Sequence, residues 1–98
     1  MQLILSSKNV PLTSGLKTFV TQRLSKLSKL PALSSVQVLI DVNRHKHQKE
    51  SLATVELIGS VEGKTVMVKE HAHNFYAAFF KAADTLKLRL LQLKKRAA

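Results

Sequence analysis

The sequence predicts an α+β fold in which a four-stranded mixed sheet carries both helices on one face. Short runs rich in β-branched residues indicate strands, and two longer runs with apolar residues every three or four positions indicate helices. The runs follow one another in the order β-α-β-β-β-α. The first strand can therefore pair in parallel with the second through a right-handed crossover, while the last three strands pair as antiparallel hairpins. The 98 residues suffice for a single domain, 1–98.

The N-terminal third of the chain predicts a strand followed by a helix. Residues 2–6 (QLILS) form a short apolar run, and Pro11 then turns the chain because proline cannot donate a ladder hydrogen bond. Thr13 is a candidate N-cap for a helix over residues 14–30, which Pro31 ends. The apolar stripe of this helix consists of Leu16, Val20, Leu24 and Leu27, with Phe19 on its flank.

The middle of the chain predicts the other three strands. Residues 36–42 (VQVLIDV) alternate in the period of a strand, and the polar segment 43–50 connects them to the next strand at 52–58 (LATVELI). Two glycines within 59–64 predict a hairpin turn, and 65–70 (TVMVKE) is the returning strand. The sheet face without helices is expected to present Gln37, Leu39, Asp41, Thr54 and Glu56.

Residues 74–96 predict one long helix, uninterrupted by glycine or proline, with Asn74 as its N-cap. Its expected buried stripe consists of Tyr76, Phe79, Ala83, Leu86, Leu90 and Leu93. Two apolar side chains off this stripe, Phe80 and Leu91, are expected to pack against the first helix. Leu88 points away from the stripe and is expected at the surface.

Positive charge is the strongest functional signal. Sixteen Lys and Arg residues outnumber six Asp and Glu residues, which gives a formal net charge of +10. Such an excess favours a polyanionic partner over a merely solvated surface, and it is concentrated on the two helical segments. No aromatic residue lies on a predicted strand, so the pattern favours structured RNA bound through its shape and phosphates. The candidate RNA-binding residues are Lys17, Arg23, Lys26, Lys29, Lys81, Lys87, Arg89, Lys94 and Lys95.

Several function classes have little support. The chain contains no cysteine, which excludes disulfides and thiolate metal sites and fits a reducing cytoplasm. No apolar run reaches the roughly 20 residues of a membrane span. Nucleophile elbows, Walker loops and dinucleotide-binding turns are absent from the sequence. We therefore expect no enzyme activity, no cofactor and no small-molecule substrate.

Two His-x-His pairs, His45/His47 and His71/His73, follow strands that end at the same edge of the predicted sheet. Four histidines could in principle bind a metal ion. However, a strand separates the two pairs, and no Asp or Cys completes a tetrahedral set. Surface or RNA-contacting histidines are therefore the favoured interpretation, and no metal site is predicted.

Short matches to a known family extend over nearly the whole chain. They include Met1-Gln2-Leu3 at the start, QRLSKLSKL at 22–30, VQVLIDV at 36–42 and Phe75-Tyr76-Ala77-Ala78. The last segment is similar to the family motif Asp-Met-Tyr-Ala-Ala. In these segments the chain resembles the short ribosome hibernation promoting factors and the related ribosome-associated inhibitor A. The family has the fold predicted above.

The resemblance implies a cytoplasmic, non-enzymatic translation factor that is monomeric off the ribosome. Family members bind the small ribosomal subunit and its 16S-type rRNA at the decoding channel and keep ribosomes idle under stress. Arg23, Lys26 and Lys29 match basic positions in the first helix of the family, which implies rRNA contacts, and Lys17 matches more loosely. In the second helix, over 84–90, the basic residues are displaced from the family pattern. The chain resembles the short form, or the N-terminal domain of a longer one.

Two alternatives remain open at this stage. A general module for structured RNA would explain the same charge pattern without a ribosome. A protein-interaction domain could instead use Leu88 and the exposed face of the sheet. An enzyme is the reading with the least support.

Overall fold

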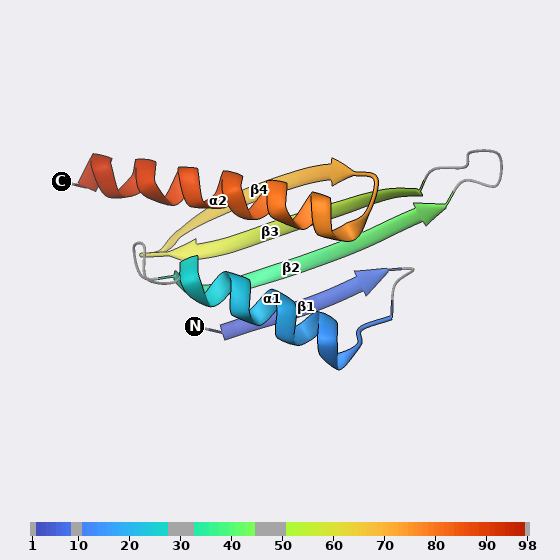
Figure 1. Cartoon of the computed structure of the whole chain (residues 1–98). Helices are drawn as coiled ribbons and strands as arrows, with labels where there is room; N and C mark the ends of the chain where they lie inside the picture. The colour runs from blue at the N-terminus through green and yellow to red at the C-terminus, as the bar shows by residue number, and fades with distance from the viewer. Residues whose placement is uncertain (1, 9–10, 28–32, 45–50, 98) are drawn as a thin grey trace.

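The computed structural model describes residues 2–8, 11–27, 33–44 and 51–97, without the side chains of 43–44, 51 and 94–97. The elements are β1 (Gln2–Lys8), α1 (Ser14–Leu27), β2 (Leu33–Arg44), β3 (Ser51–Val61), β4 (Lys64–Ala72) and α2 (Phe75–Ala97). The strands form one sheet in the order β1-β2-β3-β4, with β1 parallel to β2 and the other pairs antiparallel. Both helices lie side by side on one face of this sheet (Figure 1). The predicted α+β fold class is confirmed.

Alternation along the strands separates a core face from an open face. On the core face the central strands bury Val36, Val38, Ile40, Ala53, Val55 and Leu57. The helices cover these residues with Val20, Leu24 and Leu27 from α1 and with Phe79, Leu86 and Leu90 from α2. The residues expected on the open face are all half-buried and alternate with the core-facing positions along β2 and β3: Gln37, Leu39, Asp41, Thr54 and Glu56.

Both predicted helix caps are present. The Thr13 Oγ1 atom accepts a hydrogen bond from the backbone N–H of Leu16 at 3.1 Å, and the Asn74 Oδ1 atom accepts one from the backbone N–H of Ala77 at 2.9 Å. Each cap satisfies one of the N–H groups that have no partner inside the first helical turn. The caps therefore fix the starts of α1 and α2 at Ser14 and Phe75, as expected from the sequence. The expected end of α1 near Pro31 lies outside the described residues.

The predicted buried stripe of α2 is confirmed at Phe79, Leu86 and Leu90 and wrong at Tyr76. Tyr76 was expected in the core but is 55% exposed, while its neighbour Phe75 is buried. Ala82 is fully buried where Ala83 was expected, and Ala83 is only partly buried. Phe75 takes the core position in the first turn, and Tyr76, about 100° further around the helix, lies beside Phe19 of α1. The N-terminal half of α2 consequently offers an aromatic side chain to the surface.

The predicted turn at 59–64 is shorter in the structure. Strand β3 continues to Val61 and β4 begins at Lys64, so only Glu62 and Gly63 form the turn. Both have positive φ, 51° and 79°, which is the requirement of a type I′ hairpin turn. Gly59 lies inside β3 and is buried: a Cβ atom there would lie 3.1 Å from the Cδ2 atom of Leu33. The first glycine therefore provides space for the core, and only the second one serves the turn.

Replacing Glu62 with asparagine is expected to stabilise the domain by about 0.5–1 kcal/mol, because asparagine tolerates the left-handed region better than glutamate does. Gly63→Ala is expected to act in the opposite direction, since its φ of 79° is unfavourable for a residue with a Cβ atom. Thermal unfolding of the two variants and the wild type measures both effects. A Glu62→Asn variant that melts below the wild type would contradict the turn assignment.

Candidate RNA interface

Six of the predicted RNA-binding residues have described side chains, and all six are exposed on the helices. Lys17, Arg23 and Lys26 belong to α1, and Lys81, Lys87 and Arg89 belong to α2. Lys29 lies outside the described residues. Lys94 and Lys95 lie in α2, and their side chains fall outside the description. Among the described acids, only Asp84 lies on a helix, so the helical layer is predominantly positive.

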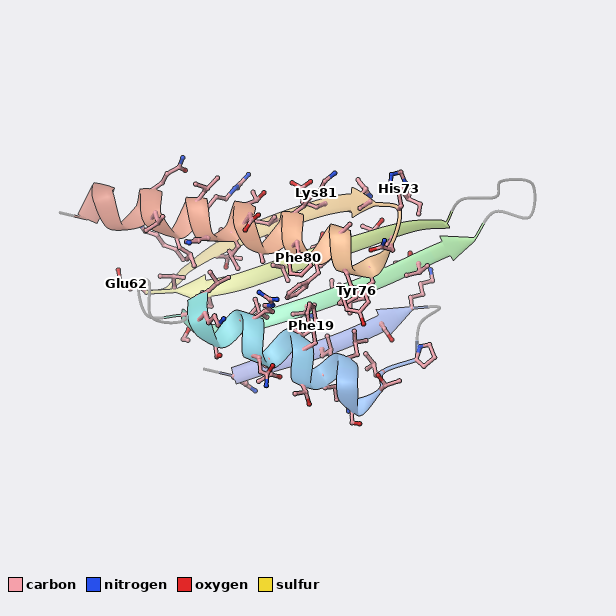
Figure 2. The ribbon with its side chains drawn as sticks, viewed as in Figure 1. Phe19, Glu62, His73, Tyr76, Phe80 and Lys81 are labelled. Atoms are coloured by element: carbon pink, nitrogen blue, oxygen red, sulfur yellow. The ribbon has the colours of Figure 1, made fainter. Side chains whose placement is uncertain are left out.

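Between the two helices lies an aromatic seam, formed by Phe19, Arg23, Tyr76 and Phe80. Phe19 is central to it: its ring centroid lies 5.1 Å from that of Tyr76 and 5.9 Å from that of Phe80, with nearly perpendicular planes. Edge-to-face contacts of this kind contribute about 0.5–1.5 kcal/mol beyond the apolar area they bury. Figure 2 shows the three rings in the space between the ribbons of α1 and α2. The expected packing of Phe80 against the first helix is confirmed.

The guanidinium group of Arg23 lies over two of these rings. Its Cζ atom is 5.6 Å from the centroid of Phe19 and 5.1 Å from the centroid of Phe80. Guanidinium groups are attracted to the faces of aromatic rings, and this attraction restricts the otherwise flexible side chain. Arg23 is thus a surface cation held in a defined position, whereas an ordinary exposed lysine is not.

Lys26 and Lys87 extend the positive charge along the seam. Lys26 lies one turn beyond Arg23 on α1, three residues further along the chain, and so remains on the same side of that helix. Lys87 follows Phe80 by seven residues, which is two helical turns, and it therefore lies on the side of α2 that faces α1. Arg23, Lys26 and Lys87 form what we call the seam cations.

Other predicted cations lie away from the seam. Lys17 precedes Arg23 by six residues, which places the two side chains roughly 120° apart around α1. The Nζ atom of Lys81 donates to the backbone carbonyl of His71 at 3.4 Å, beside β4, and Figure 2 shows Lys81 on the side of α2 away from α1. Arg89 lines a groove between α2 and β4 together with Thr65 and Met67. The described candidates therefore fall into the seam cations, Lys17 on another side of α1, and a pair on the β4 side of α2, Lys81 and Arg89.

The open face of the sheet has a different charge pattern. Lys8 is the register partner of Asp41 on the neighbouring strand, and Lys69 is the register partner of Glu56. These four side chains line one shallow hollow of about 350 Å³. Opposite charges at directly facing strand positions attract each other and largely cancel at a distance. The positive field of the described residues is therefore stronger over the helices than over the open face.

The described histidines show no metal-site arrangement. The Nδ1 atom of His71 lies 2.9 Å from the Oγ1 atom of Thr54, its register partner on β3. His45 and His47 lie outside the described residues. Within the described ranges there is no group of three or more His, Asp or Glu residues that could hold an ion. None of the helices described here combines the length and hydrophobicity that a membrane span requires.

Sequence reasoning missed the aromatic seam. All five aromatic residues were seen to lie on helices, but they were not expected to gather between them. The signal was present in the spacing: Phe19 and Arg23 are four residues apart, as are Tyr76 and Phe80, so each pair forms one surface of its helix. Phe80 was expected to pack against the first helix, but Tyr76 was assigned to the core, so the contact of both rings with Phe19 was missed.

Comparison with known proteins agrees with this fold. The family model described as "Sigma 54 modulation protein / S30EA ribosomal protein" matches residues 3–98. A protein of Deinococcus radiodurans named ribosome hibernation promotion factor is 31% identical over 93 residues, covering 94% of this chain and 48% of that protein. A protein of the same name from Mycobacterium tuberculosis is 27% identical, covering 97% of this chain and 44% of that protein. The chain thus spans about half the length of these relatives.

Two solved structures share the architecture. The N-terminal domain of Protein Y from Thermus thermophilus superposes with a TM-score of 0.82 at 21% identity, covering 95% of this chain and 99% of that one. A ribosomal subunit interface protein from Coxiella burnetii superposes equally well at 13% identity, covering 97% of this chain and 99% of that one. At these identities the similarity establishes the fold.

Proposed function

Because the chain belongs to the Sigma 54 modulation protein / S30EA ribosomal protein family, we propose that it is a ribosome hibernation factor. In this proposal the domain binds the small ribosomal subunit at the decoding channel and silences translation there by occupying space, without catalysis. The names of its relatives from Deinococcus radiodurans and Mycobacterium tuberculosis support a hibernation role. A cytoplasmic location and a monomeric state off the ribosome belong to the same proposal.

The observation that carries the proposal is the position of the seam cations. Arg23, Lys26 and Lys87 are all exposed on the two helices, and Arg23 lies over the rings of Phe19 and Phe80. Cations that neutralise phosphates release condensed counterions, and this release drives binding to nucleic acid. Among the described acids, Asp41 and Glu56 lie on the open face and Glu62 lies in the β3–β4 turn, which leaves Glu70 and Asp84 on the side of the helices. The helical layer is therefore the proposed rRNA-binding surface.

The dimensions of the domain support a steric mechanism. Its principal extents are 51 × 25 × 18 Å, and its helical layer is the proposed contact. A folded body of this size in the channel would exclude tRNA and mRNA sterically, since all three would require the same volume and the same phosphates. The flanking cations Lys17, Lys81 and Arg89 are proposed to reach phosphates beside the main contact, and Lys29, Lys94 and Lys95 retain their predicted role.

Competition on isolated subunits tests the proposal. We expect the protein to co-sediment with 30S subunits in a sucrose gradient and to displace tRNA bound to them, and we expect nuclease treatment to abolish the co-sedimentation. Comparable affinity for a naked RNA duplex and for 30S subunits would instead indicate a general RNA-binding module. Recovery with a ribosome-free protein after nuclease treatment would indicate a protein-interaction domain.

A further inference from the structure

The aromatic seam carries more exposed ring surface than the core requires. All aromatic side chains of the protein, four Phe and one Tyr, gather in this region. Phe75 and Phe79 are buried, but Tyr76 is 55% exposed and Phe80 is 41% exposed. Rings that only stabilised the packing of α1 on α2 would gain by complete burial, since the gain is roughly proportional to the apolar area removed from water. The outer rim of the seam is thus available to a ligand.

The rim is rigid. Phe19 meets Tyr76 and Phe80 at interplanar angles of 82° and 80°, and it is itself held by Phe79 at 5.6 Å. Tyr76 also contacts Phe75 with a centroid distance of 5.2 Å. Because Tyr76 and Phe80 lie one turn apart on α2, their exposed parts face the same space above the seam. Rings that are already fixed in place lose little conformational entropy when a ligand binds them.

Arg23 adds a planar cation to the same rim. Its guanidinium group is in contact with Phe80 and Phe19 on one side, and the residue as a whole is exposed. Unpaired bases bind proteins by stacking on aromatic rings and on arginine planes. Lys26 lies one turn from Arg23 on α1 and Lys87 two turns from Phe80 on α2, so both are placed to neutralise phosphates near such a base.

We propose that Tyr76, Phe80 and Arg23 form a stacking site for an unpaired base of the bound RNA. The inference rests on the proposed function and specifies its ligand chemistry: a nucleotide outside a double helix, in addition to the phosphate backbone. It also replaces the expectation that shape and phosphates alone are recognised, because the stacking surface lies on helices instead of strands. Stacking accepts every base, so no strong sequence preference is expected.

Three hairpin RNAs that differ at one position test the site. The first contains a single bulged adenosine, the second an abasic bulge, and the third is fully paired. Tyr76→Ala is expected to lower the affinity for the bulged adenosine by about five-fold to a hundred-fold, because stacking contributes about 1–3 kcal/mol per base. The same substitution should leave the affinities for the other two RNAs within about two-fold, and Tyr76→Phe should retain the wild-type preference.

A matched control and a direct probe make the test specific. Leu88→Ala removes a similarly exposed apolar side chain, 61% exposed and on another side of α2, and should change none of the three affinities. Tyr76 is the one tyrosine of the chain, so a tyrosine-selective isotope label gives a single set of ring resonances in an NMR spectrum. They should move upfield on addition of the bulged hairpin and stay in place with the abasic one.

Two results would overturn the stacking site. If Tyr76→Ala lowered the affinity for all three hairpins equally, the ring would serve the folded structure and not a bulged base. Unchanged affinity for the bulged adenosine would show that no base contacts the ring. Measuring 30S binding alongside separates the two proposals. If 30S subunits bind the wild type and Tyr76→Ala equally, and the bulge preference is absent, only the stacking site fails. If 30S subunits do not bind but the preference is present, only the ribosomal function fails.

Discussion

Reversing the three seam cations, with Arg23→Glu, Lys26→Glu and Lys87→Glu combined, is expected to lower 30S affinity about a hundred-fold or more. Each cation removed costs a charge-assisted contact, and each new carboxylate repels the phosphates that it faces. The slope of log affinity against log salt concentration should also fall, by about 2–3, because three fewer phosphates are neutralised. Binding of labelled protein to 30S subunits over a series of salt concentrations measures both quantities.

A matched variant controls for net charge. Lys8→Glu, Lys64→Glu and Lys69→Glu change three exposed lysines on the sheet and the hairpin, so the net charge falls from +10 by the same amount as in the seam variant. If position matters, this control should retain most of the affinity and of the salt slope. An equal loss of 30S affinity in the two variants would show that binding depends on overall charge alone. The helical layer would then not be the rRNA-binding surface.

Phe79→Ala is expected to destabilise the domain by about 3–5 kcal/mol, the usual cost of removing a fully buried aromatic side chain. Phe79 is completely buried, it is the largest of the fully buried side chains, and its ring contacts Phe75 and Phe19. Because small domains are stable by about 5–15 kcal/mol, this loss should lower the melting temperature by roughly 15–30 °C. Thermal unfolding followed by circular dichroism measures the shift.

A substitution at the surface serves as the comparison for Phe79→Ala. Leu88→Ala removes an apolar side chain that is 61% exposed, and its effect should stay within about 0.5 kcal/mol of zero. A small shift for Phe79→Ala would mean that α2 is not docked on the sheet as described. A large shift for Leu88→Ala would mean that this side chain is covered in solution.

The fold was predictable because its determinants are local. Residues 36–42 and 52–58 alternate with the period of a strand, and Thr13 and Asn74 precede helices that they cap as expected. The turn was placed less accurately, because glycine has two roles that look alike in a sequence. Gly63 allows a positive φ, while Gly59 leaves room for Leu33. Only the three-dimensional packing distinguishes these roles.

The candidate site was predictable in composition but not in arrangement. The excess of Lys and Arg on two helical segments is visible in the sequence, and six of the nine candidates are exposed as expected. Their grouping depends on how each helix is rotated about its own axis. For α2 the apolar residues occupy more than one side, so the periodicity identified Phe79, Leu86 and Leu90 as core but not the place of every aromatic residue. Packing against Phe19 draws Tyr76 to the edge that faces α1.

The lengths of the two helices limit how much RNA the protein can follow. At about 1.5 Å per residue, the 23 residues of α2 span roughly 35 Å and the 14 residues of α1 roughly 21 Å. Along the axis of a B-form DNA duplex one strand carries a phosphate about every 3.4 Å, so a helix as long as α2 can accompany on the order of ten nucleotides of one strand. A contact of this length covers only a small part of a long RNA. The protein can therefore distinguish its target from other RNA only where several folded strands come together in a shape that fits the domain.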